Sequence, residues 1–160
     1  MSYCIKCGRK LVDRYLENEG VIPYCENCKE YRFKMYNVAI SMIVIAPNNK
    51  ILLIKQYHKN DYILVAGYVN YQESIESALK RELKEETDLE LVSYKFNKSQ
   101  YYEPSNTLMV NFICYVSDDN VHNNFEIDSY QWFYPDDALV NIKPNSLAKQ
   151  FLAHYLANKI

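Results

Sequence analysis

One segment, "IESALKRELKEET" at residues 75–87, constrains the fold most, because its spacing predicts a helix with carboxylates on its packing face. At about 100° per residue, the apolar side chains occupy one sector of the helix, and Glu82 and Glu86 fall inside that sector. Glu85 lies at the edge of the sector, and the lysines of the segment point away from it. The acids are therefore not a solvated charged face. The alternative is a frayed helix end that leaves all three in water.

The carboxylates at positions 82, 85 and 86 are close enough to repel one another strongly. At about 5–6 Å and an effective dielectric constant of about 20, each pair repels by roughly 3 kcal/mol. Either a proton is taken up or a cation neutralises the group. Because all the ligands are oxygens, a hard cation, Mg²⁺ or Mn²⁺, is the expected partner. Arg81 is placed to brace Glu85 from the side.

Segments with the character of strands dominate the rest of the chain, and helices are interleaved near its middle and end. "PNN" at residues 47–49 separates two apolar, β-branched runs and predicts a hairpin. Ser74 is suited to cap the acidic helix, Pro135 opens a short helix, and Asn145 or Ser146 caps a final helix. This order predicts an α/β fold in which a mixed sheet carries helices on its faces. The expected strands cover residues 37–46, 50–58, 61–69, 90–102, 107–117 and 127–134.

Four of the five cysteines form two Cys-x-x-Cys pairs, Cys4 with Cys7 and Cys25 with Cys28. No secretory signal is expected from "MSYCIKCGRK", so this spacing predicts a four-thiolate Zn²⁺ site rather than disulfides. The alternative is a pair of redox motifs, which would come with a thioredoxin-like pattern that the sequence does not show. About thirty residues bury too little surface to fold alone. Residues 1–34 are therefore expected to form a zinc ribbon that the metal stabilises.

Length and charge exclude several classes of function. The 160 residues suit one domain with a small appendage. The net charge of −2 gives no electrostatic case for binding nucleic acid or an anionic membrane. No apolar run approaches the roughly 18–20 residues of a membrane span. We therefore expect a cytoplasmic protein.

A pattern around the acidic helix resembles the Nudix box of the Nudix hydrolases. All but one of its restricted positions agree. The exception is Asp88, which stands where the family has a glycine just past the helix, and aspartate tolerates the left-handed conformation expected there. The matching residues are Gly67, Glu73, Arg81, Glu82, Leu83, Glu85, Glu86 and Leu89.

Beyond this box, the chain is similar to the NADH pyrophosphatase branch of the family, in which a four-cysteine ribbon precedes the Nudix domain. Three segments each resemble part of that branch: "AGYV" (66–69), "EIDSYQWF" (126–133) and "PNSLAKQFL" (144–152). A fourth, "SQYYEPSNTLM" at 99–109, agrees only in part with the branch signature for NAD(H), because the prolines in register are missing. The resemblance implies a zinc ribbon over 1–34 and a Nudix α/β/α sandwich over 35–160.

The resemblance also implies an activity, the hydrolysis of the pyrophosphate bond of a dinucleotide such as NAD(H) to nucleoside monophosphates. Mg²⁺ or Mn²⁺ would neutralise the diphosphate and activate a water. Glu82 and Glu86 would be the central ligands, Glu85 would assist, and Glu126 would be an extra ligand from another strand or loop. Arg81 would hold this cluster of acids.

Further residues follow from the same resemblance. Glu73 would tie down the loop before the helix, and Tyr68 would stack on a substrate ring. The other expected substrate contacts are Ala66, Gly67, Ser99, Gln100 and Tyr102.

Two alternatives stay open. The same chemistry would serve ADP-ribose, FAD, dinucleoside polyphosphates or NAD-capped RNA. A non-catalytic Nudix module that senses a nucleotide would be expected to lose metal ligands, and this chain keeps them. Members of the branch form dimers, so we expect a homodimer with a nucleotide substrate. No membrane partner is expected, and no nucleic acid apart from NAD-capped RNA.

Overall fold

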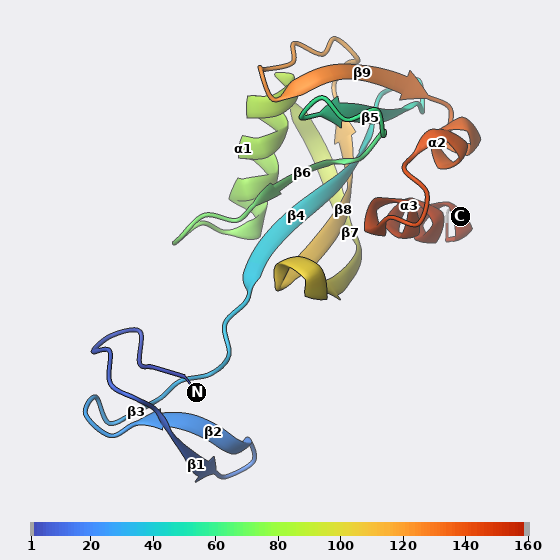
Figure 1. Cartoon of the computed structure of the whole chain (residues 1–160). Helices are drawn as coiled ribbons and strands as arrows, with labels where there is room; N and C mark the ends of the chain where they lie inside the picture. Colours follow the sequence, from blue (N-terminus) through green and yellow to red (C-terminus); the bar gives the residue numbers. More distant parts are fainter. Residues whose placement is uncertain (1, 159–160) are drawn as a thin grey trace. The chain divides into compact units, whose positions relative to one another are not determined.

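The computed structural model describes residues 2–158, which divide into two compact units (Figure 1). The first unit extends to Tyr36 and the second begins at Asn37. Each unit has its own sheet.

The N-terminal unit is a small antiparallel sheet without an apolar core. Its strands pair in the order β1-β2-β3. Among its described residues, Cys4 and Cys25 are the only buried ones, while many of its large apolar side chains are exposed. Such a unit needs stabilisation other than hydrophobic burial. The strands are β1 (Val12–Leu16), β2 (Gly20–Cys25) and β3 (Glu30–Tyr31).

The second unit is built on a six-stranded mixed sheet in the order β7-β8-β4-β5-β9, with β6 paired to β4. β4 and β8 are parallel, and the other pairs are antiparallel. β4 is central and buried from Ala39 onward, which explains its continuous apolar run. The strands are β4 (Asn37–Ile45), β5 (Ile51–Gln56), β6 (Val65–Tyr68), β7 (Leu91–Tyr102), β8 (Thr107–Val116) and β9 (Ile127–Phe133), and a 3-10 turn, η1 (Glu103–Ser105), joins β7 to β8.

Helices cover both faces of this sheet, as the sequence predicts for an α/β sandwich (Figure 1). α1 (Ile75–Thr87) packs on one face, and α2 (Pro135–Asn141) and α3 (Leu147–Ala157) pack on the other. Successive residues of β4 point to opposite faces. Met42 therefore lies in the core beneath α1, and Ile43 lies in the core beneath α2 and α3.

The helix α1 begins and ends where the sequence predicts. The Ser74 hydroxyl oxygen accepts a hydrogen bond from the Ser77 N–H at 3.1 Å. Asp88 follows the helix with a φ of 59°, in the left-handed region. At α3, Ser146 rather than Asn145 is the cap. These ends are set by local chemistry, which explains why the sequence alone is sufficient to place them.

The strand expected over residues 61–69 is the clearest difference. Only Val65–Tyr68 pairs with β4. Ile63 instead exchanges backbone hydrogen bonds of 3.0 and 2.9 Å with Ile54 of β5. The segment thus passes from one neighbouring strand to another, and an apolar run does not reveal such a change of partner.

Candidate active site and metal centre

Glu86, in the last turn of α1, is the most buried carboxylate among the described residues, at 3% exposure. Its Oε2 accepts a hydrogen bond from Gln56 Nε2 at 3.3 Å. Burial, followed by repulsion from Glu82 and Glu126, raises the pKa of Glu86 to about 8. The helix therefore holds a carboxylate on its packing face that is disfavoured as an anion until positive charge is supplied.

Arg81 organises the acids on the neighbouring part of the helix. Its Nε and one terminal nitrogen each donate to a Glu73 carboxylate oxygen at 2.7 Å. The other terminal nitrogen donates to Glu82 at 2.7 Å and to Glu85 at 3.2 Å. The fifth contact is a hydrogen bond to the Tyr68 carbonyl oxygen at 3.0 Å. Because a guanidinium carries five N–H donors, all of them are used.

Glu73 connects this network to the loop before α1. Its Oε2 accepts a hydrogen bond from the Asn70 N–H at 2.8 Å. The hydrogen bonds from Arg81, followed by the one from the Asn70 backbone, lower the pKa of Glu73 to about 2. Glu73 therefore stays ionised and holds the loop against the helix.

Gly67 leaves the space that the Glu82 carboxylate occupies. A Cβ atom at position 67 would overlap Cδ and both carboxylate oxygens of Glu82. Glycine is needed here because it has no side chain to collide with the Glu82 carboxylate. Its backbone conformation is not the reason, since Gly67 is not among the residues with positive φ.

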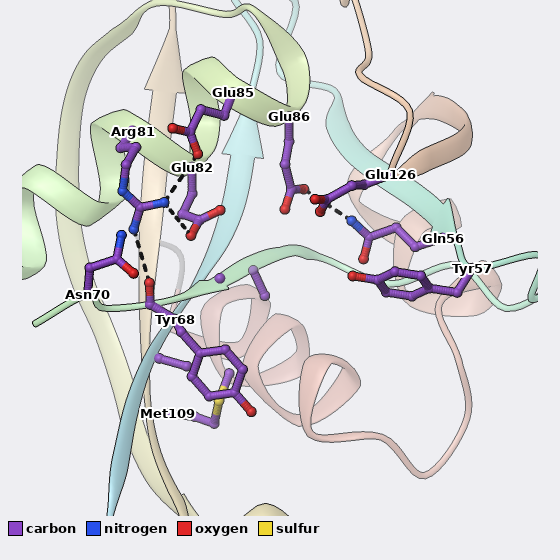
Figure 2. Close-up of a pocket in the computed structure, with 13 residues that line it drawn as sticks. Gln56, Tyr57, Tyr68, Asn70, Arg81, Glu82, Glu85, Glu86, Met109 and Glu126 are labelled. Carbon is purple, nitrogen blue, oxygen red and sulfur yellow. Dashed lines mark hydrogen bonds and ion pairs between the residues drawn. The ribbon is translucent and has the colours of Figure 1, made fainter.

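These side chains surround a cavity of about 530 Å³ (Figure 2). Glu82, Glu86 and Glu126 lie along one side of it, and the half-exposed ring of Tyr68 lies across from them. The cavity is therefore acidic on one side and aromatic on the other. Its lining consists of Ala39, Gln56, Tyr57, Ala66, Gly67, Tyr68, Asn70, Arg81, Glu82, Glu85, Glu86, Met109 and Glu126.

Glu126 reaches the cavity from the loop between β8 and β9. Its N–H donates to Asn124 Oδ1 at 2.9 Å. The same loop donates backbone hydrogen bonds to the end of α1, from Asn124 to the Glu86 carbonyl at 3.3 Å and from His122 to the Thr87 carbonyl at 2.9 Å. The loop is thus tied to the part of the helix that carries the acids.

The structure gathers most of the predicted site residues around this cavity, but not all of them. Gln100 and Tyr102 of β7 line a neighbouring cavity of about 460 Å³, which shares Met109 with the first. Ser99, also on β7, lines neither of these two cavities. Glu73 stands behind Arg81 rather than in the lining.

Five lining residues were not among the site residues that the sequence analysis predicted: Ala39, Gln56, Tyr57, Asn70 and Met109. The strand expected over residues 50–58 ends at Gln56, and Tyr57 and His58 follow it with φ values of 55° and 56°. The one available signal was a polar residue closing an apolar strand. That signal does not separate a site residue from an ordinary strand end.

The donors around the cavity fit a hard divalent cation. Four carboxylates line it, from Glu82, Glu85, Glu86 and Glu126, against the single guanidinium of Arg81. Carboxylate oxygens are the ligands that Mg²⁺ and Mn²⁺ prefer. Within residues 2–158, however, the four cysteines are the only set of three or more potential metal ligands that is already compact. The glutamates would have to turn toward a bound ion.

The four cysteines of the N-terminal unit form a set that could hold a metal ion. The sulfur atoms of Cys4, Cys7, Cys25 and Cys28 all lie within 4.8 Å of one another. Cys4 and Cys28 are 3.9 Å apart, and Cys7 and Cys25 are 3.5 Å apart. A tetrahedral zinc ion with Zn–S bonds of about 2.3 Å would separate its sulfurs by about 3.8 Å. The spacing therefore fits Zn²⁺.

The surroundings of the thiols also fit a metal. Burial opposes ionisation of Cys4, but hydrogen bonds, first from Arg32 Nε at 3.3 Å, lower the pKa of Cys4 to about 6. The thiol contact with Cys7, followed by burial, raises the pKa of Cys28 to about 12. The four thiols therefore do not ionise together by themselves, and a cation would allow them to.

No helix within the described part of the chain is both long enough and apolar enough to span a bilayer.

Comparisons with known proteins show which proteins this chain is similar to. A family model described as "NUDIX domain" matches residues 35–155. The NAD-capped RNA hydrolase NudC of Vibrio atlanticus is 26% identical over 174 residues, which cover 96% of this chain and 63% of that protein. The protein of the same name from Haemophilus influenzae is 28% identical over 161 residues, covering 96% of this chain and 59% of that protein. This chain thus spans less than two thirds of the length of these curated relatives.

A solved structure shares the fold over nearly the whole chain. The crystal structure of a NUDIX hydrolase from Nitrosomonas europaea superposes with a TM-score of 0.69 at 18% identity, covering 99% of this chain and 92% of that one.

Proposed function

This chain belongs to the NUDIX domain family, and on that premise we propose that it hydrolyses the diphosphate bond of a nucleotide-linked compound. The observation that carries the proposal is the burial of Glu86 beside Glu82 and Glu126 at a cavity with a single cationic side chain. Such a surplus of carboxylates destabilises the fold unless bound cations neutralise it.

In this proposal, Glu82, Glu85, Glu86 and Glu126 hold Mg²⁺ or Mn²⁺. When bound, such ions neutralise the diphosphate and lower the pKa of a water that attacks phosphorus. Arg81 keeps Glu82 and Glu85 at the cavity through the hydrogen bonds described above. Arg81 thus keeps both carboxylates beside the cavity, from where they would turn toward an ion.

Gln56 has the corresponding role for Glu86. Its amide N–H donates to Oε2, so the lone pairs of Oε1 remain available for a cation. Tyr68 supplies an aromatic face across the cavity from the acids, where a substrate ring would stack.

We propose a dinucleotide such as NAD(H) as the substrate, cleaved to nucleoside monophosphates. The relatives named as NAD-capped RNA hydrolases support this class, and NAD-capped RNA is the related candidate. ADP-ribose, FAD and dinucleoside polyphosphates share the same reactive bond. We propose that Gln100 and Tyr102 contact the part of the substrate beyond the diphosphate, because they line the neighbouring cavity that shares Met109 with the first.

We further propose that residues 1–34 are a ribbon held by structural Zn²⁺, and that residues 35–160 carry the hydrolase. Four thiolates at tetrahedral spacing leave no open position on the metal. The two metals would thus have separate roles. Zn²⁺, bound by soft thiolates, would stabilise the ribbon, and Mg²⁺ or Mn²⁺, bound by hard carboxylates, would bind the substrate diphosphate.

A substrate panel tests the activity directly. The protein is incubated with NADH, NAD, ADP-ribose, FAD and NAD-capped RNA in Mg²⁺ or Mn²⁺, and release of AMP or of the decapped RNA is followed. Glu86→Gln should lower kcat by more than about 100-fold, which exceeds the roughly 10–100-fold loss typical of an outer-shell change. The matched control is Glu76→Gln, in the first turn of the same helix and outside the cavity lining. Turnover by Glu86→Gln at the control rate would refute the assignment.

A further inference from the structure

Tyr57 lies on the cavity wall without a role in the network described above. It follows Gln56, the last residue of β5, and it is 65% exposed. Figure 2 shows its hydroxyl directed into the cavity beside Gln56, whereas the hydroxyl of Tyr68 points away from the acids. An exposed tyrosine directed into an acidic cavity calls for a physical explanation.

The backbone that presents Tyr57 is unusual. Tyr57 and His58 are consecutive left-handed residues, with φ values of 55° and 56°. Bulky L-residues rarely adopt this conformation, and it persists only where the surroundings enforce it. Asp128 of β9 supplies that constraint. Its Oδ2 accepts the His58 N–H at 2.6 Å, and its Oδ1 lies 3.2 Å from His58 Nδ1.

The pairing of β5 with β9 also changes at this point. The register shifts between Lys55 and Gln56, and a local irregularity of this kind redirects the side chains that follow it. The strained turn and the shift together turn Tyr57 toward the cavity. Without them, the strand would continue in the extended conformation that the sequence predicts for residues 50–58.

The cavity offers few donors for an anion. Its charged lining consists of four carboxylates and Arg81, and all five Arg81 N–H groups are engaged within the protein. Gln56 uses one of its two amide N–H groups for Glu86 and keeps the other, and the Tyr68 hydroxyl points away from the acids. The Tyr57 hydroxyl, by contrast, has no hydrogen-bond partner within residues 2–158, and it lies at the Glu86 and Glu126 end of the cavity.

A bound diphosphate carries more oxygens than its cations coordinate, and the remaining oxygens accept hydrogen bonds. We propose that the Tyr57 hydroxyl donates a hydrogen bond to a phosphoryl oxygen of the bound diphosphate and so positions the substrate against the carboxylates. This inference rests on the proposed function, because it assumes that a diphosphate occupies the cavity. Partial burial, followed by the charges of Glu126, Glu86 and Glu82, raises the pKa of Tyr57, which is consistent with a protonated hydroxyl.

Two substitutions separate the hydroxyl from the ring. Tyr57→Phe removes only the donor, and Tyr57→Leu also removes the aromatic face. The probe is inorganic pyrophosphate, titrated calorimetrically in the presence of Mg²⁺, because it has no ring to stack. Tyr57→Phe should weaken the Kd by about 10-fold or more, as expected for a hydrogen bond to a charged group. Tyr57→Leu should weaken it to the same extent. The control is Tyr71→Phe, whose ring is 91% exposed and outside the cavity lining.

Each outcome decides the inference. If Tyr57→Phe binds pyrophosphate as the wild type does, the hydroxyl is not a phosphate donor, whether or not Tyr57→Leu is impaired. If Tyr57→Phe weakens binding while no compound of the substrate panel is hydrolysed, the positioning role stands and the proposed function fails. If the wild type hydrolyses the panel but Tyr57→Phe is unchanged in both Kd and kcat/KM, the function stands and the inference fails. A wild type that does not bind pyrophosphate overturns the inference, and the substrate panel decides the proposed function separately.

Discussion

At the scale of single residues, the position of Glu82 depends on Gly67, because no room remains for a Cβ atom between them. We expect Gly67→Ala to turn the Glu82 carboxylate away from the cavity. The value of kcat/KM should then fall by about 100-fold, the loss expected when a reacting group is misplaced by roughly one ångström. Hydrolysis of the best substrate in Mg²⁺ measures this effect. The far-ultraviolet circular dichroism spectrum should stay that of the wild type, because Gly67 does not have the positive φ that would disfavour alanine. Wild-type kinetics in Gly67→Ala would show that Glu82 is not needed where it lies.

At the same scale, the raised pKa of Glu86 makes the stability of the protein depend on pH. Its pKa is about 8 in the folded protein, against an ordinary value of 4.5. Between these two values the folded protein holds a proton that the unfolded chain has lost, so the free energy of unfolding falls as pH rises from 4.5 to 8 and levels off above that. At 1.36 kcal/mol per pKa unit, the upper limit of the loss is about 5 kcal/mol.

Glu86→Gln should remove this contribution to the pH dependence. Denaturant unfolding at pH 5, 6.5 and 8, with no added Mg²⁺, measures the free energy for both proteins. The variant should be the more stable protein at pH 8, and the difference should shrink toward pH 5. The other ionisable side chains are common to both proteins, so their contributions cancel in the comparison. Adding Mg²⁺ at pH 8 should stabilise the wild type and not the variant. Parallel pH curves for the two proteins would contradict the assignment.

At the scale of elements, the residue that ends α1 lowers the stability of the fold, because it is an aspartate in a left-handed backbone conformation. Asp88 has a φ of 59° at the C-cap, where glycine has no steric penalty and other L-residues lose roughly 1–2 kcal/mol. Asp88→Gly should therefore raise the free energy of unfolding by about 0.5–1 kcal/mol. The gain is reduced by loss of the Lys84–Asp88 ion pair, which is half exposed and contributes little.

Thermal unfolding of Asp88→Gly beside Asp88→Ala tests this prediction. The alanine variant loses the same ion pair but keeps the strained conformation, so it should melt below the wild type while the glycine variant melts above it. Both should keep wild-type kcat, because Asp88 does not line the cavity. Equal melting temperatures for the two variants would show that the backbone conformation is not the cause.

The elements also show which features of the fold and the site could be predicted from the sequence. α1 was predictable in both extent and orientation, because its cap, its apolar stripe and its acids are all recorded within residues 74–88. Gly67 and Glu126 entered only through the family resemblance, since their proximity to the helix depends on strand pairing and on a loop. Tyr57 was not predictable. Its direction is set by Asp128, some seventy residues away along the chain, and no local pattern records such a contact.

At the scale of the whole molecule, the two compact units differ in what stabilises them. The unit from Asn37 onward has two apolar cores, one on each face of its sheet. The unit up to Tyr36 buries only Cys4 and Cys25 among its described residues. Burial at about 25 cal/mol per Å² of apolar surface therefore stabilises the second unit, whereas the first would depend on the metal that we propose for its four cysteines.

Removal of the metal should therefore unfold one unit and spare the other. Protein depleted of zinc by a chelator should lose protease resistance within its first 36 residues, releasing a resistant fragment that begins near Asn37. The tyrosine signal in the near-ultraviolet circular dichroism spectrum should fall, because Tyr24 and Tyr31 lose their edge-to-face contact. The main melting transition, which reports the two apolar cores, should not move.

Cys25→Ser should reproduce all of these changes without a chelator, whereas Cys114→Ala, in the core beneath α1, should keep one zinc per chain. Protease resistance of residues up to Tyr36 in the metal-free protein would mean that contacts other than the four thiolates hold this unit together.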